Sequence, residues 1–170
     1  DYTSSAQLFD ADYQDKWLDY VNGNFGRVDG ARDEASRRVD EEIRARIADE
    51  RTHQALEKEY LAGNSNLVWN PNTKSWARKG SNRVEYQEGQ YLNQVQQMHQ
   101  NYDNIRDNYG LSRDEVDLGT ALYDTEDQIR QGKLKATPEL AVQMQNLRDR
   151  LGDRETAYRA WRMAQQPDTE

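Results

Sequence analysis

Apolar residues recur at helical spacing along most of the chain. Between residues 91 and 109 they are separated by 4, 3, 4, 3 and 4 positions, which is the heptad spacing of a helix with one apolar seam. We expect this helix to pack against the other long helix of the chain, in a coiled coil with a second molecule, or both. The predicted helix seam consists of Tyr91, Val95, Met98, Tyr102, Ile105 and Tyr109.

A second long helix is predicted from about residue 31 to residue 62. Its apolar positions Ala35, Val39, Ile43 and Ile47 are four residues apart, and acidic residues precede arginines at the favourable four-residue spacing around them. This pattern is typical of a solvated helix that buries a thin apolar seam. About 30 residues at 1.5 Å each give a rod roughly 45 Å long, which favours a hairpin of two long helices.

Helix start and stop signals divide the C-terminal third. Ser112 and Glu115 fit a capping box, Thr137 precedes a proline that begins a helix, and Gly152 is a plausible stop. Three short helices are therefore expected after residue 110. The predicted fold class is all-α: an elongated helical bundle or hairpin of long helices with one small β-hairpin insert and three short C-terminal helices, divided into regions 1–110 and 111–170.

Residues 66–80 interrupt the helical pattern. The turn-forming residues 70–73 separate "LVW" from "SWA", which predicts a two-stranded β-hairpin with Trp69 and Trp76 close to each other across the strands. Two strands alone are marginally stable in water. The hairpin is therefore expected to pack on the helices or on a partner.

Residues 70–84, which include most of this insert, carry four bases and no acid, although the whole chain carries a net charge of −8. Bases next to tryptophans can bind nucleic acid, a lipid interface or an acidic partner subunit, and the alternative is a connector whose tryptophans cap the helical pair. We favour partner docking over nucleic acid, because the remaining surface repels a polyanion. The predicted partner-binding residues are Trp69, Trp76, Lys74, Arg78, Lys79 and Arg83.

Composition indicates a chain that depends on partners. Only 27 of the 170 residues are Leu, Ile, Val or Phe, a fraction below the roughly 20% at which charged chains tend toward disorder. Ten tyrosines and four tryptophans supply large apolar area with a polar end, which suits interfaces as well as cores. We therefore expect an oligomer or a heteromeric complex, with a melting temperature that depends on concentration.

Little in the chain indicates catalysis. His53 lies one turn from Asp49 and from Glu57, but acidic neighbours are common in so acidic a helix, and the segment beginning at Asp124 lacks the glycine and the glutamate of a calcium loop. No cysteine is present. We expect no enzymatic activity, no catalytic residues, no metal and no cofactor.

No stretch of the sequence has the length and apolar character of a membrane span or a secretion signal, which leaves the cytoplasm and a virus particle as compatible locations. The predicted function is a structural or assembly component of a larger complex, such as a virion-internal or scaffolding protein. It would bind partner subunits through tyrosine-rich helix faces and the tryptophan-containing basic hairpin. The alternative is an acidic regulatory or inhibitory binding protein that acts as a discrete subunit.

Overall fold

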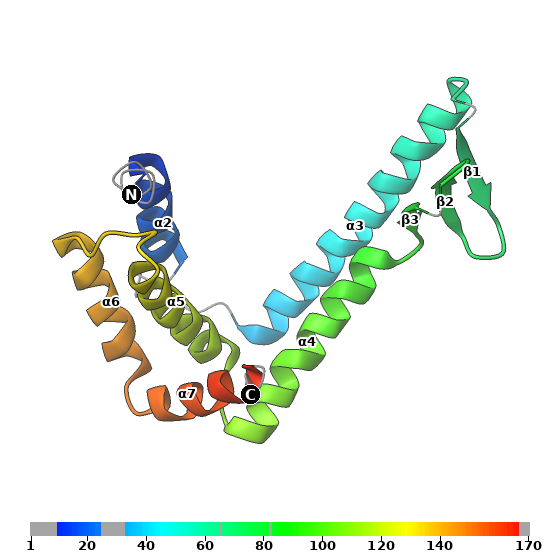
Figure 1. The fold of residues 1–170 in the computed structure, drawn as a ribbon. Helices are drawn as coiled ribbons and strands as arrows, with labels where there is room; N and C mark the ends of the chain where they lie inside the picture. Colours follow the sequence, from blue (N-terminus) through cyan, green and yellow to red (C-terminus); the bar gives the residue numbers. More distant parts are fainter. Residues whose placement is uncertain (1–9, 25–32, 65, 82, 167–170) are drawn as a thin grey trace. The chain divides into compact units, whose positions relative to one another are not determined.

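The computed structural model describes residues 10–24, 33–64, 66–81 and 83–166. Helices dominate this part of the chain, and a small antiparallel sheet follows the longest of them (Figure 1). In chain order the elements are α2 (Ala11–Asn24), α3 (Glu34–Leu61), β1 (Leu67–Asn70), β2 (Ser75–Arg78), β3 (Val84–Gln87), α4 (Gln90–Tyr109), α5 (Arg113–Arg130), α6 (Pro138–Leu151) and α7 (Arg154–Gln165).

The chain divides into two compact units. The sheet unit, residues 31–101, contains α3, the three strands and the first part of α4. The helical unit, residues 1–30 and 102–170, contains α2, the last turns of α4, and α5, α6 and α7. This grouping joins the N-terminal helix to the C-terminal helices, whereas the sequence pattern predicted regions 1–110 and 111–170.

The predicted fold class is wrong in two respects, although the described chain is mainly helical. The long helices do not form one bundle, because α4 is shared between the two units. The insert is a three-stranded antiparallel sheet in the order β1-β2-β3, and not a two-stranded hairpin. Trp76 lies opposite Trp69 in β1 and opposite Tyr86 in β3. The third strand has a physical role, since Trp76 and Tyr86 are each only 3% exposed and two strands alone give such side chains little cover.

The helical unit begins its helices where the sequence predicts. The Ser112 hydroxyl accepts a hydrogen bond from the backbone N–H of Glu115, whose carboxylate accepts one from the Ser112 N–H. The Thr137 hydroxyl accepts from the N–H of Leu140, one residue after the proline at the first position of α6. Both predicted helix starts are confirmed, because capping depends on residues a few positions apart.

The core of the helical unit is formed by α5, α6 and α7, with α2 packed onto it. Leu122, Leu147, Tyr158 and Val21 are fully buried in one cluster. Tyr158 of α7 lies directly on α5 at Gly119, where an added Cβ would be 2.3 Å from an atom of the tyrosine ring. The absence of a side chain at Gly119 is therefore what allows α7 to approach α5 this closely.

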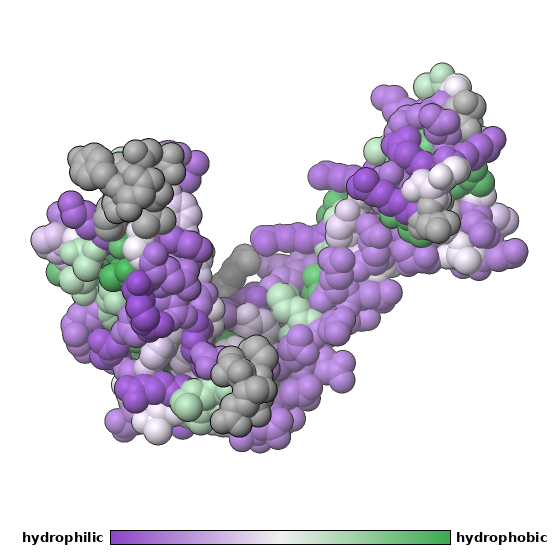
Figure 2. Space-filling model, in the orientation of Figure 1, coloured by the Kyte–Doolittle hydropathy of each residue, from purple (hydrophilic) through white to green (hydrophobic). Residues whose placement is uncertain are grey.

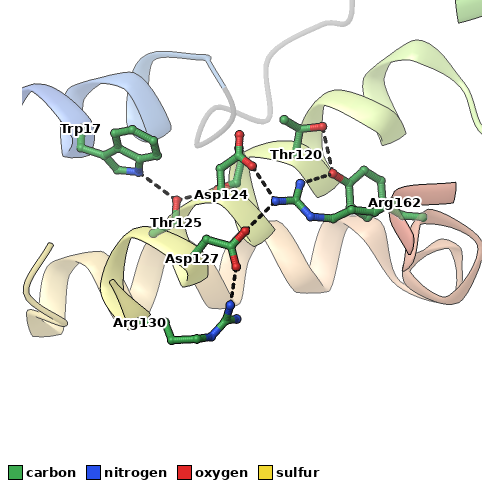
Figure 3. Close-up of polar contacts among 9 residues, drawn as sticks. Trp17, Thr120, Asp124, Thr125, Asp127, Arg130 and Arg162 are labelled. Atoms are coloured by element: carbon green, nitrogen blue, oxygen red, sulfur yellow. Dashed lines mark hydrogen bonds and ion pairs between the residues drawn. The ribbon is translucent and has the colours of Figure 1, made fainter. Parts of the chain in front are cut away.

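One turn further along α7, an arginine joins α7 to α5 through a polar network (Figure 3). The guanidinium of Arg162 donates to Asp124 at 2.7 Å, to Asp127 at 2.8 Å and to the Tyr158 hydroxyl at 2.9 Å. Burial disfavours the charged form, but the hydrogen bonds to Asp124 and Tyr158 outweigh it and raise the pKa of Arg162. The arginine is charged at every pH at which the fold exists, so it acts as a permanent clamp.

Two tyrosines, the buried Tyr158 and the partly buried Tyr102, make the stability of the fold sensitive to alkaline pH. Burial raises the pKa of Tyr158 and of Tyr102, and the hydrogen bond that Tyr102 donates to Asp117 at 2.7 Å raises the Tyr102 pKa further. A group whose pKa is higher in the folded than in the unfolded state contributes stability below its unfolded pKa, near 10 for tyrosine. That contribution is lost as the pH rises through the folded pKa.

We therefore expect the free energy of unfolding to fall above about pH 10, by up to about 1.4 kcal/mol per pH unit for each such tyrosine. Urea unfolding at a series of alkaline pH values measures this slope. Tyr102→Phe should make the slope shallower, because one titrating group is removed. An unchanged slope in that variant would contradict the assignment of the effect to Tyr102.

In the sheet unit, the predicted seam of α3 is not buried. Val39, Ile43 and Ile47 are 54%, 50% and 43% exposed, and Ala35 is exposed as well. The buried residues of α3 are Ala45 and Asp49, on another side of the helix. The prediction that the four-residue apolar repeat faces the other long helix is therefore wrong.

Polar contacts join α3 to α4 instead. The Asp49 carboxylate accepts hydrogen bonds from the backbone N–H groups of Tyr91 at 3.0 Å and Leu92 at 3.3 Å. Gly89, the residue before α4, has no side chain with which to cap it. Further along, Nε2 of His99 lies 3.1 Å from a carboxylate oxygen of Glu41. A carboxylate of α3 thus takes the place of the missing local cap.

Candidate partner-docking site

A groove lies between the C-terminal half of α3 and the sheet. It consists of two adjoining depressions of about 730 and 560 Å³, and His53, Trp69 and Pro71 line both of them. We call it the Trp69 groove. Hydrophobic residues are visible at the surface of the sheet, among hydrophilic ones, in Figure 2. Leu61 and Val68, which line the larger depression, are 74% and 39% exposed.

The floor of the groove is an aromatic cluster centred on Trp76. The ring of Trp76 is 5.3 Å from that of Trp69 and 5.5 Å from that of Tyr60, and His53 lies 4.9 Å from Trp69. Trp76 is buried, whereas Trp69 is partly exposed and Tyr60 is 48% exposed. The buried ring of Trp76 therefore holds the partly exposed rings of Trp69 and Tyr60 in place.

One hydrogen bond determines the tautomer of His53. The Nε1–H of Trp76 donates to Nδ1 of His53 at 2.9 Å, and an indole can only donate. Nδ1 must then be the unprotonated nitrogen, which places the proton of the neutral ring on Nε2. Nε2 is 3.8 Å from the nearest Glu57 carboxylate oxygen, which is beyond hydrogen-bonding distance. His53 therefore presents a donor to the groove.

In the structure, two of the four predicted bases form ion pairs with acidic residues. Lys74 lies 3.6 Å from Glu88, and Arg78 lies 2.9 Å from Glu85 and 3.6 Å from Glu59. The predicted excess of positive charge counted only residues 70–84, and these three acids come from outside that window. They could have been found by extending the window to the next strand and the preceding helix.

Two of the predicted bases keep their charge available. Within the described ranges, the side chains of Lys79 and Arg83 have no ion-pair or hydrogen-bond partner, and both residues are exposed. Only Lys79 lines the Trp69 groove. The indole N–H of Trp69 likewise has no acceptor among the described residues. The larger depression thus contains N–H donors on His53, Trp69 and Lys79 beside one carboxylate, on Glu57, whereas the smaller depression is lined by Arg46 and Lys74 and by the carboxylates of Asp49, Glu50 and Glu88.

The predicted seam of α4 is split between the two units. Tyr91, Val95 and Met98 belong to the sheet unit and are partly buried. The remaining residues, Tyr102, Ile105 and Tyr109, are also partly buried and pack against the core of the helical unit. The buried residue of α4 is instead His99, which is 7% exposed and interrupts the seam with a polar contact.

The sequence did not reveal the roles of two residues in this region. Asp49 and His53 were considered together with Glu57 as a weak metal site. In the structure Asp49 caps α4 and His53 accepts from Trp76, so their functions differ. Among the described residues, no group of three or more His, Asp or Glu side chains is arranged to hold a metal ion.

Comparisons with known proteins leave the chain to be interpreted from its own structure. No family model, curated protein or solved structure matches it. None of the helices in the described ranges combines the length and the apolar character that spanning a membrane requires.

Proposed function

We propose that this protein is a protein-binding component of a larger assembly, and that the Trp69 groove is the site where a partner subunit docks. The observation that carries the proposal is the position of Trp69. Its ring forms a wall shared by both depressions, it is partly exposed, and its N–H has no acceptor among the described residues. A rigid aromatic side chain with an unused polar end is the usual anchor of a protein interface.

The donors in the larger depression of the groove indicate the chemistry of the partner. The Nε2–H of His53, the N–H of Trp69 and the ammonium of Lys79 all require acceptors, and the exposed Leu61 and Val68 require apolar contact. A protein segment with an apolar or aromatic side chain beside an aspartate or glutamate satisfies both requirements. Glu57, which also lines the larger depression, would repel a segment with several acids and so adds specificity.

The charges support a protein partner over nucleic acid. Two of the four predicted bases, Lys74 and Arg78, are paired with carboxylates. The chain has a net charge of −8, which opposes the approach of a polyanion to any other surface. Nucleic-acid binding would need several unpaired cations in contact with phosphates, and Lys79 and Arg83 are the two that the described part of the insert provides.

Selection from a random peptide display library provides a probe whose chemistry is not chosen in advance. Peptides that bind the wild type are expected to contain an apolar or aromatic residue next to an acid. Trp69→Ala should weaken the best peptide by about 30-fold, the effect of losing an anchor worth about 2 kcal/mol. Fluorescence anisotropy of the labelled peptide measures the change.

Two matched controls isolate the groove. Arg83→Ala removes an exposed, unpaired cation of the same sheet that does not line the groove, and it should leave affinity unchanged, whereas Lys79→Ala should weaken it. Val84→Ala removes an exposed apolar side chain from β3 as a control for Trp69→Ala. Binding of random single-stranded DNA that falls steeply with salt and disappears in Trp69→Ala would overturn the proposal.

A further inference from the structure

A second surface of the sheet unit lies along α3 and adjoins the Trp69 groove at Arg46, which lines the smaller depression. Val39, Ile43 and Ile47 form one stripe, because residues four apart lie on the same side of a helix. All three are about half exposed, and none of them lines either depression of the groove. Hydrophobic patches along α3, set among hydrophilic residues, are visible in Figure 2. We call these three residues the α3 stripe.

The stripe faces away from α4. Ala45 and Asp49, the buried residues of α3, are respectively two residues beyond Ile43 and two beyond Ile47, which is about 200° around the helix axis. The contacts with α4 are made on that opposite side by Asp49 and by Glu41, and a carboxylate oxygen of Glu42 lies 3.9 Å from Nδ1 of His99. The intramolecular partner of α3 in this unit therefore leaves the stripe uncovered.

Two arginines flank the stripe without a counter-charge. Asp40 precedes Arg44 by four residues, and Glu42 precedes Arg46 by four, which is the spacing that favours an ion pair within a helix. Nevertheless, neither arginine has an ion-pair partner among the described residues. An apolar stripe between these two arginines is complementary to an apolar helix with acidic residues at its edges.

We propose that this helix is α3 of a second copy of the chain, and that the two helices pair antiparallel with the two-fold axis near Ile43. In that arrangement Val39 of each copy faces Ile47 of the other. The order of charges is also reversed between the copies, so that Asp40 of one lies beside Arg44 of the other on one edge of the stripe. On the other edge, Glu42 of one copy lies beside Arg46 of the second.

A parallel pair does not have this complementarity. In a parallel pair the opposite edges of the two helices meet, so Asp40 of one copy would lie beside Glu42 of the other, and Arg44 would lie between Glu42 and Arg46 of the other, which brings like charges together. The charge pattern therefore selects the antiparallel orientation. With three apolar residues from each copy, the interface is smaller than those of permanent dimers, and we expect a dissociation constant of roughly 10–100 μM.

The chain has no cysteine, which makes the orientation directly testable. Ile43→Cys should form a disulfide-linked dimer on mild oxidation, since the two sulfur atoms meet near the two-fold axis. Val39→Cys and Ile47→Cys should each cross-link weakly alone and strongly when the two proteins are mixed. Val142→Cys, an equally exposed apolar position on α6, is the matched control and should remain monomeric.

Sedimentation equilibrium of the cysteine-free protein measures the association itself. Ile43→Asp should weaken dimerisation by at least tenfold with unchanged helical circular dichroism, whereas Ile43→Leu should retain it. The proposal is overturned if the wild type stays monomeric at several hundred micromolar, if the dimer survives Ile43→Asp, or if each cysteine variant cross-links best with itself. Peptide binding in the Trp69 groove should persist in Ile43→Asp, so the two proposals can fail separately.

Discussion

Replacing Gly119 with alanine is expected to destabilise the helical unit by about 3 kcal/mol or more, the upper part of the range for overpacked cores. This destabilisation is the opposite of the usual effect, since alanine within a helix is normally about 1 kcal/mol more favourable than glycine. The new methyl group would lie 2.3 Å from the ring of Tyr158, which is fully buried and has no space to move into. Urea unfolding followed by circular dichroism measures the loss.

Gly23→Ala is the matched control. Gly23 is also a glycine within a helix, α2, but an added Cβ there meets no atom within 4 Å. This variant should be neutral or slightly stabilising. Gly119→Ala should recover part of its loss when Tyr158 is changed to leucine, because the smaller side chain relieves the overlap. Stabilisation by Gly119→Ala alone would show that α7 does not rest on α5 at this point.

In the sheet unit, the largest loss is expected from Trp76→Ala. Trp76 is 3% exposed, contacts Trp69 and Tyr60, and donates the hydrogen bond that holds His53. Removing a buried tryptophan side chain typically costs about 3–5 kcal/mol. A sheet of three four-residue strands has little other apolar contact to offset that loss. We expect the strands to lose their order while the helical unit stays folded.

Native-state hydrogen exchange resolves this local effect better than a global melt, because the two units need not unfold together. Protection of the β2 amides should be lost in Trp76→Ala and kept in α5. Trp69→Ala, at a partly exposed position, should reduce that protection much less while weakening peptide binding by about 30-fold. Equal losses of protection in the two variants would mean that Trp69 supports the sheet instead of serving as a docking residue.

The helix starts of the helical unit could be predicted because their determinants are local. The Ser112 cap and its partner Glu115 are three residues apart, and the Thr137 cap directly precedes a proline. Such signals do not depend on what the helix packs against. The proximity of Trp69 and Trp76 across the strands was predictable for the same reason, because the turn-forming residues lie between them, and the structure places the two residues directly opposite each other.

The packing of the long helices could not be predicted from apolar spacing. The regular repeat in α3 marks the side that faces away from α4, and the contact with α4 is made by Asp49 and by His99 with Glu41. Polar contacts of this kind leave no trace in a hydrophobic periodicity. The charge of the insert was misjudged for a related reason, because the acids that pair with Lys74 and Arg78 lie beyond the segment in sequence.

The cap on α4 also determines the order in which the sheet unit can fold. Asp49 and Tyr91 are 42 residues apart in sequence, and the whole sheet lies in the loop between them. The entropy of closing this loop must be overcome before the first turn of α4 gains its hydrogen-bond acceptors. The start of α4 is therefore expected to form late, after α3 and the strands have come together, while helices with local caps such as α5 can nucleate early.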